Sequence, residues 1–231
     1  MNEVLRQEKK FLIRLPEMYE QSGYLAKVMM QDSHNRGDGY LIRSLYFDTL
    51  YERDYMEKED GVELRRKFRL RSYGPDYSFG ILEMKQKQGG MQKKRSLRMS
   101  KEDASRLINR EYDVLLKYEE PFAKECYALL NMYCYVPKAV VEYRRKAFVA
   151  KENQIRVTFD HHIVGTESCF DIFDRNLLQN PVLGTELVVL EVKYNGFLLS
   201  YIKDYIQKIN RSETSVSKYS LSRMTSMHYQ F

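Results

Sequence analysis

Cysteine is scarce in this chain, and its scarcity already limits the classes of protein to consider. Only three cysteines occur among 231 residues, and their odd number argues against a disulfide framework. Their positions, Cys126, Cys134 and Cys169, do not have the spacing of metal ligands. A reducing, cytoplasmic setting is the simplest expectation.

Long apolar runs are also absent. The first thirty residues contain no apolar signal-peptide core, and no stretch approaches the roughly 18 apolar residues that a membrane span needs. If the protein works at a membrane, we expect a membrane partner protein to take it there. No repeat, low-complexity segment or linker interrupts the chain. The length favours a single domain over residues 1–231.

A large excess of one charge is missing as well. Thirty-eight Lys and Arg residues stand against 32 Asp and Glu residues, so the formal net charge is only +6. Basic stretches therefore stand out locally, which favours a confined anion site over a general nucleic-acid surface. We expect no nucleic-acid partner. The 43% hydrophobic content is enough for a core.

Strand patterns dominate what is present. Alternation and turn signals predict strands over residues 8–15, 41–48, 62–73, 79–87, 92–99, 139–150, 154–161 and 186–194. Helices are expected over residues 16–30, 100–109, 121–133, 197–209 and 218–227. Gly89-Gly90 is expected to form a hairpin turn. Without regular strand–helix alternation, these elements predict an antiparallel α+β fold, and closure into a barrel would leave no sheet edge open.

The stretch from Glu63 to Tyr73 is the most informative segment. Successive side chains on a strand point to opposite faces. One face therefore carries four cations, namely Arg65, Lys67, Arg69 and Arg71. The other face is apolar except for Arg66, with Leu64, Phe68 and Leu70. Four cations in a row repel one another unless water or an anion compensates them, so the strand is either a solvated basic surface or part of a polyanion site.

Charges recur on one face of other predicted strands. The groups are Glu8 with Lys10, Glu83 with Lys85 and Lys87, Arg156 with Thr158 and Asp160, and Glu191 with Lys193. Taken singly, each group is also what a half-exposed antiparallel strand shows. If the sheet closes into a tunnel with helices outside, these faces line the lumen. Arg and Lys would then bind a chain of phosphates, and the few carboxylates would hold a divalent metal.

Nine segments carry a family resemblance in their order and spacing. They are residues 8–11, 46–49, 69–74, 82–85, 93–95, 143–148, 155–160, 190–193 and 217–220, which begin with Glu-Lys-Lys-Phe and end with Ser-Lys-Tyr-Ser. Together they cover nearly the whole chain. The sequence resembles the catalytic domain of the vacuolar transporter chaperone (VTC) polyphosphate polymerase, a branch of the triphosphate tunnel metalloenzymes.

The resemblance implies an eight-stranded antiparallel β-barrel, the triphosphate tunnel, with helices packed outside. It also implies transfer of the terminal phosphoryl group of ATP onto a polyphosphate chain, helped by Mn²⁺ or Mg²⁺. By position, the implied catalytic residues are Arg69, Arg71, Arg145 and Arg156. The implied phosphate-binding residues are Lys10, Lys85, Lys94 and Lys218, and the implied metal ligand is Glu191.

Two departures from the pattern bear on the site. The Glu-x-Glu-x-Lys motif of the hydrolytic tunnel enzymes is absent, because the first strand offers only Glu8 before Lys10. That favours the polymerase branch. Arg145 does not share the period-2 face of Glu142, Arg144 and Lys146, so two alternatives stay open: Arg144 is the inward residue, or a bulge turns Arg145 inward.

Three functions remain open at this stage. Besides the polymerase, a metal-dependent triphosphate hydrolase and a non-catalytic polyphosphate- or polyanion-binding module would each need the same basic surface. The absence of a Ser-His or Cys-His pairing is no objection, because phosphoryl transfer needs positioning and charge neutralisation more than a protein nucleophile. His161 and His162 adjoin Asp160, but neighbours on a strand point opposite ways, so a structural role is favoured over a metal site.

Overall fold

The computed structural model describes residues 6–88, 91–209 and 212–227. The predicted turn at Gly89-Gly90 lies outside these residues. The chain forms two compact units. Unit 1 contains residues 1–41, 143–163 and 181–221, and unit 2 contains residues 42–142, 164–180 and 222–231. Each unit is described by itself.

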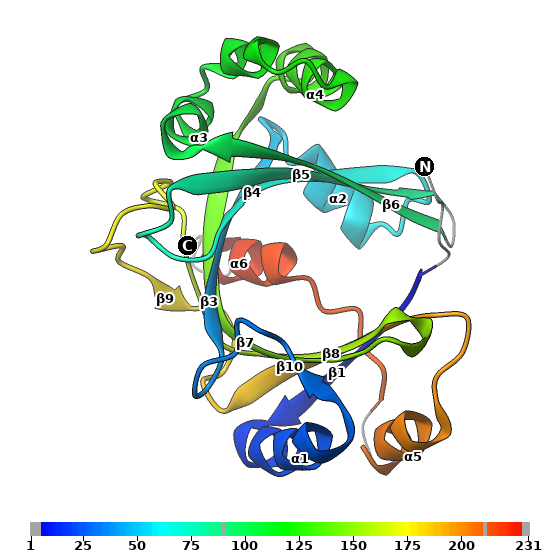
Figure 1. Ribbon diagram of the computed structural model, residues 1–231. Coiled ribbons are helices and arrows are strands. Elements are labelled where there is room, and N and C mark those ends of the chain that lie inside the picture. The colour runs from blue at the N-terminus through cyan, green and yellow to red at the C-terminus, as the bar shows by residue number, and fades with distance from the viewer. Residues whose placement is uncertain (1–5, 89–90, 210–211, 228–231) are drawn as a thin grey trace. The chain divides into compact units, whose positions relative to one another are not determined.

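Unit 1 is built on antiparallel strands with helices on one face. Its strand order is β1 (Arg6–Arg14), β10 (Leu187–Asn195), β8 (Ile155–Thr166) and the second half of β7 (Tyr135–Ala150), and the short β2 (Met30–Gln31) pairs with β7. Helices α1 (Leu15–Val28) and α5 (Ser200–Lys208) cover one face of these strands (Figure 1). Helix α1 begins where expected because Pro16 fits a first turn and the Glu17 carboxylate accepts the Arg14 N–H at 2.7 Å.

Unit 2 repeats this layered arrangement. The first half of β7 is followed in the sheet by β3 (Tyr40–Thr49), β4 (Arg65–Ser72), β5 (Phe79–Gln88) and β6 (Met91–Ser100). Its helices are α2 (Arg53–Glu59), α3 (Lys101–Ile108) and α4 (Pro121–Met132), and Figure 1 shows α3 and α4 on one face of β4, β5 and β6. The remaining elements are the 3-10 turns Tyr112–Lys117 and Glu152–Gln154, the two-residue β9 (Asn180–Pro181) and α6 (Lys218–Met227).

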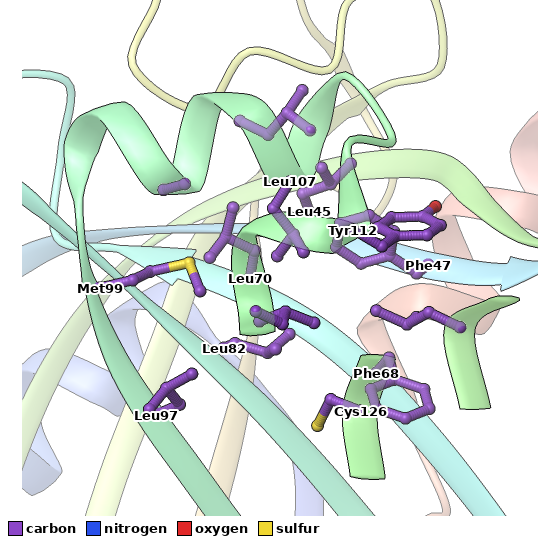
Figure 2. Packing of buried hydrophobic residues seen from close by; sticks show 14 of the residues in the cluster. Leu45, Phe47, Phe68, Leu70, Leu82, Leu97, Met99, Leu107, Tyr112 and Cys126 are labelled. Carbon is purple, nitrogen blue, oxygen red and sulfur yellow. The ribbon is translucent and has the colours of Figure 1, made fainter. Parts of the chain in front are cut away.

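Each unit has its own hydrophobic core on the helix-covered face. In unit 2, Phe68 and Leu70 of β4 are fully buried against α3, α4 and the turn between them, and Figure 2 shows them beside Leu82, Leu107 and Cys126. In unit 1, alternate residues of strands β1, β8 and β10 lie in a second core, which packs against α1 and α5. Burying a side chain of this size contributes about 1.5–3 kcal/mol. The two cores therefore fix which face of each strand is left for charged residues.

The expected α+β class with an antiparallel sheet is confirmed, but a closed barrel is not. Eight of the ten strands in the described residues follow one open path, β1-β10-β8-β7-β3-β4-β5-β6, and β2 and β9 pair beside it. No pairing in that part of the chain joins β1 to β6. The segment around Thr214 contacts part of the outer edge of β1, where the Thr214 N–H donates to the Lys10 carbonyl at 2.9 Å.

Candidate functional site

The charged face of unit 2 lies on β4, β5 and β6, opposite the core. Register partners in antiparallel strands share a face. Arg65 pairs with Lys87, Lys67 with Lys85, Arg69 with Glu83, and Lys85 in turn with Lys94. We call this group the Glu83 cluster: Arg65, Lys67, Arg69, Arg71, Glu83, Lys85, Lys87 and Lys94. The alternation predicted for residues 65–71 is confirmed, with the cations on one face and Phe68 and Leu70 in the core.

Glu83 organises the buried end of this cluster. It is only 3% exposed, and its Oε2 lies 2.5 Å from Arg69 Nε and 3.4 Å from Arg71 Nη2. Lys94 bonds the other carboxylate oxygen. Burial would raise the pKa of Glu83, but the charges of Arg69, Arg71 and Lys94 outweigh it and lower that pKa. One ionised carboxylate thus orients three cations.

The Glu83 cluster has far more positive charge than this carboxylate can balance. Glu83 is the one acidic residue in the sequences of β4, β5 and β6, and like charges lie directly opposite each other at Arg65 and Lys87 and at Lys67 and Lys85. Opposed like charges destabilise a sheet. A bound polyanion would remove that penalty, so the cluster fits a row of phosphates.

Two polar atoms at the Arg71 end of the Glu83 cluster are buried. Arg71 and Ser44 are register partners on β4 and β3. Within the described part of the chain, Arg71 Nε and Ser44 Oγ are buried without a hydrogen-bond partner. An unsatisfied buried donor costs about 1–3 kcal/mol. Because both atoms are closed to solvent, this cost belongs to the fold around Arg71.

The charged face of unit 1 carries a second group, which we call the Asp160 cluster. It consists of Glu8, Lys10, Tyr143, Arg145, Arg156, Thr158, Asp160, Glu191, Lys193 and Lys218, contributed by β1, β7, β8, β10 and the first residue of α6. Strand neighbours such as Phe159 and Leu190 point to the other face, into the core. Unlike the Glu83 cluster, this group mixes its five cations with three carboxylates.

Asp160 forms the centre of this cluster. It is fully buried, and its Oδ1 and Oδ2 accept from Arg145 Nε at 2.6 Å and Arg145 Nη2 at 2.7 Å. Lys218 Nζ lies 2.5 Å from the same Oδ2. The Tyr143 ring lies beside both cations, 5.4 Å from the guanidinium carbon of Arg145 and 4.6 Å from Lys218 Nζ.

The structure decides between Arg144 and Arg145 in favour of Arg145. Arg145 shares the face of Tyr143 and is 9% exposed, whereas Arg144 points to solvent. The alternative that placed Arg144 on the charged face was wrong, because it assumed that Glu142 also lies on that face. Glu142 instead pairs with Arg43 at 2.5 Å, and Arg43 reaches the Ile172 carbonyl in the core of unit 2.

Glu191 belongs to a lattice of alternating charges. Register partners across β1 and β10 are Glu8 with Lys193, and Lys10 with Glu191. Glu191 lies 3.0 Å from Lys193, 3.8 Å from Lys10 and 3.8 Å from Arg145. Glu8 lies 2.8 Å from Lys10 and 3.7 Å from Lys193. Burial would raise the pKa of Glu191, but the charges of Lys193, Lys10 and Arg145 hold that pKa well below its usual range.

The oxygen atoms near Glu191 can supply only part of the ligand set of Mg²⁺ or Mn²⁺. Thr158 pairs in register with Glu191, and its Oγ1 is buried with no partner among the described residues. No three His, Cys, Asp or Glu side chains in the described part come together as a metal site. Mg²⁺ commonly takes one or two carboxylates and completes its shell with water and substrate phosphates. The pair Glu8 and Glu191 fits that pattern.

The other predicted residues hold different partners. Arg156 Nη2 donates to Asp32 at 2.7 Å and to the Tyr40 hydroxyl at 3.0 Å. Lys10 donates to the Val216 carbonyl at 3.2 Å, just before Lys218 in the chain. Lys85 lies between Lys67 and Lys94 in the Glu83 cluster. Unit 1 thus contains Lys10, Arg145, Arg156, Glu191 and Lys218, and unit 2 contains Arg69, Arg71, Lys85 and Lys94.

Sequence reasoning missed some members of these clusters and misjudged two histidines. Asp160 was named only among the carboxylates of the charged faces and was given no role of its own, although its place two residues after Thr158 was a usable signal. His161 and His162 do not point opposite ways. His162 has a left-handed φ of 49°, and the two Nδ1 atoms lie 2.6 Å apart. His161 Nε2 also lies 2.9 Å from the Asp38 carbonyl, which supports a structural role.

Fold and clusters together define a class: antiparallel α+β proteins that present organised cations on the face opposite the helices. The VTC domain model matches residues 5–227, so the chain belongs to the VTC domain family. No curated protein matches the chain. Among the helices of the described residues, none is long and apolar enough to cross a membrane.

Solved structures resemble the chain at the level of the fold. A protein from Hippeastrum, described as an adenylyl cyclase with a dominant triphosphatase activity, has a TM-score of 0.56 at 12% identity over 95% of this chain and 96% of its own. An adenylate cyclase-like protein from Bacillus halodurans has a TM-score of 0.53 at 13% identity over 92% and 95%. One from Vibrio parahaemolyticus has a TM-score of 0.51 at 11% identity over 96% and 99%. At 11–13% identity, these similarities show a shared fold alone.

Proposed function

We propose that the protein is a phosphotransferase that moves the terminal phosphoryl group of ATP onto a polyphosphate chain. The observation that carries the proposal is the Glu83 cluster, in which three strands supply seven cations and a single carboxylate. Such an excess of fixed charge fits a linear polyanion better than a single small anion. Membership of the VTC domain family supports the polymerase assignment.

The residues divide into roles that follow from their contacts. Arg69 and Arg71 present guanidinium groups already oriented by Glu83, and a guanidinium binds phosphate oxygens in a bidentate manner. Lys85 and Lys94 add point charges on the same face. In unit 1, Arg145 and Lys218 are held by Asp160, and Lys10 and Arg156 extend the cationic surface. Within each unit, these groups would neutralise negative charge on the phosphate oxygens that they contact.

A divalent metal, Mn²⁺ or Mg²⁺, belongs to this proposal. Glu191 would hold it together with Glu8, and it would supply positive charge that stabilises the transferring phosphoryl group. The chain's own contribution is to keep the Glu191 carboxylate ionised. Lys193, Lys10 and Arg145 do this by lowering its pKa. The finer fold prediction, an eight-stranded tunnel closed around the phosphates, is also part of the proposal, as are a cytoplasmic location and a membrane partner protein.

A triphosphate hydrolase is the second candidate. The structural similarity to the Hippeastrum protein, whose triphosphatase activity is described as dominant, favours it. Hydrolysis would use the same cations and the same metal, with water in place of polyphosphate as the acceptor. A binding module without chemistry is the third candidate, because cation clusters alone are enough for binding.

One experiment separates the three candidates. Purified protein is incubated with ATP labelled at the terminal phosphate, with Mn²⁺ or Mg²⁺, with and without a short polyphosphate primer. The products are separated on a gel. Acid-labile label in long chains supports the polymerase. Label released only as orthophosphate would assign the hydrolase, and unchanged ATP with retained polyphosphate binding would leave the binding module.

A further inference from the structure

Asp160 makes contacts that anion binding alone does not require. The side chain is fully buried, so a ligand cannot reach it. Both of its oxygens are taken by cations from different elements, Arg145 of β7 and Lys218 at the start of α6. These cations are almost buried themselves, with side chains 10% and 13% exposed. Asp160 therefore joins the two cations into one unit whose small exposed part faces away from the core.

The remaining contacts restrict this unit further. The Tyr143 ring packs beside both cationic head groups, 5.4 Å from Arg145 and 4.6 Å from Lys218. Arg145 Nη2 also lies 3.8 Å from Glu191 Oε2. A guanidinium held in a fork by one carboxylate and packed against a ring has little rotational freedom. The direction in which Arg145 and Lys218 can donate is therefore set before any ligand arrives.

Charge considerations show that this arrangement does not serve affinity. Asp160 cancels one of the two positive charges that Arg145 and Lys218 would offer an anion, and removing a carboxylate from water is itself costly. Burial would raise the pKa of Asp160, but Arg145 and Lys218 outweigh it and lower that pKa to about 2, so the carboxylate stays ionised at neutral pH. A site built only for strong binding of phosphate would gain from a neutral residue here.

We propose that Asp160 is a positioning residue for phosphoryl transfer: it holds Arg145 and Lys218 in the one geometry that favours the transferring group over the bound substrate. This inference rests on the function proposed above and deepens it. Fixed donors stabilise a transition state because they need no reorganisation when charge develops. Mobile donors still attract phosphate but lose that advantage.

The test compares Asp160→Asn with a matched control, Glu142→Gln. The Asn variant keeps the shape and one acceptor oxygen but removes the charge. Glu142 also forms an ion pair with a buried cation, Arg43, but on the core side of unit 2 and outside both clusters. Folding of each variant is first checked by its thermal unfolding, and kinetics are measured well below the transition. The substrate is ATP with Mn²⁺ and a polyphosphate primer.

We expect Asp160→Asn to lower kcat by about 10–100-fold, the usual loss when a group that orients a functional residue is removed. KM should stay the same or fall, because the site gains one net positive charge. Glu142→Gln should change neither parameter. If Asp160→Asn behaves like the control, or raises KM with kcat unchanged, the positioning role is wrong.

A second measurement does not depend on turnover. Acetylation of Lys218 by an amine-reactive ester is followed by mass spectrometry, with the exposed Lys9 as the internal reference. Lys218 should react slowly in the wild type and faster in Asp160→Asn. Equal rates would overturn the claim that Asp160 holds Lys218. A wild type without ATP or triphosphate turnover would instead reject the proposed function, and it would do so whatever the labelling rates are.

Discussion

Arg69 and Glu83 are register partners on β4 and β5, and Arg69 Nε lies 2.5 Å from the Glu83 carboxylate. The pair lies where three cations converge on one buried acid. Glu83 holds the Arg69 guanidinium in one orientation. The Arg69 side chain is still 24% exposed, so it can bind a further anion. This relationship gives the first two predictions.

Replacing Arg69 or Arg71 with Ala should weaken the binding of tripolyphosphate or polyphosphate by about 1.5–3 kcal/mol each, the size of a charged hydrogen bond. Arg66→Ala is the matched control, because Arg66 lies on the opposite face with its guanidinium 4.9 Å from the Tyr133 ring. Isothermal titration of the three variants measures the effect. Equal losses at all three positions would show that general surface charge, and not an organised site, binds the anion.

Glu83→Gln should destabilise the free protein by about 3–5 kcal/mol, because it leaves buried cations without their partner. Tripolyphosphate should then raise the melting temperature more in this variant than in the wild type, since the ligand replaces the missing negative charge. Glu125→Gln is the control, because it breaks the more exposed pair with Arg95 outside both clusters. An identical ligand-induced shift in wild type and Glu83→Gln would contradict the prediction.

Much of the sheet follows from the sequence because alternation is a local signal. The face assignments for Phe68, Arg69 and Leu70 needed only a period of two and the rule that one face is buried. Expected helices such as 121–133 agree with α4 to within one residue because Pro121 marks its first turn. These features depend on neighbours in the chain.

The features that could not be predicted from the sequence depend on contacts between residues far apart in the chain. Helix α2 was not predicted, because its first turn is capped at a distance: the Asp48 carboxylate accepts from the N–H groups of Asp54 and Tyr55. The inward position of Arg145 depends on Asp160 and Lys218, which no spacing rule connects to it. Strand alternation also gives no information on whether the two ends of a sheet meet.

Glu191→Gln should separate metal use from charge. If Glu191 holds the metal, the variant should keep its affinity for triphosphate, because removing an anion reduces repulsion toward phosphate. Turnover should fall steeply because the metal is no longer held against the transferring group. Both quantities are measured on one preparation over a range of Mn²⁺ concentrations, with Glu213→Gln as a surface control that breaks only the exposed pair with Lys9. Near-normal turnover at ordinary Mn²⁺ concentrations would remove Glu191 from the site.

Asp54 gives a prediction about stability that is independent of the site. Its side chain is 1% exposed, and Oδ1 accepts from the Tyr135 hydroxyl at 2.8 Å. Oδ2 is buried without a hydrogen-bond partner among the described residues. Burial, reinforced by the charge of Asp48, raises the pKa of Asp54 from 3.8 to about 7. The folded protein therefore keeps a proton on Asp54 that the unfolded chain releases at lower pH.

The sign of the pH effect follows from this difference. Well below pH 3.8 the carboxyl is protonated in both states and has no effect on the free energy of unfolding. As the pH rises from about 4 to 7, only the unfolded chain ionises, so the free energy of unfolding should fall by about 4 kcal/mol in total and then level off. Asp54→Asn keeps the acceptor for Tyr135 and cannot ionise, so it should lack this decrease. Urea unfolding of both proteins at several pH values between 4 and 8 measures the difference. The wild type should lose stability relative to Asp54→Asn across that range, and two parallel curves would show that Asp54 ionises normally in the folded state.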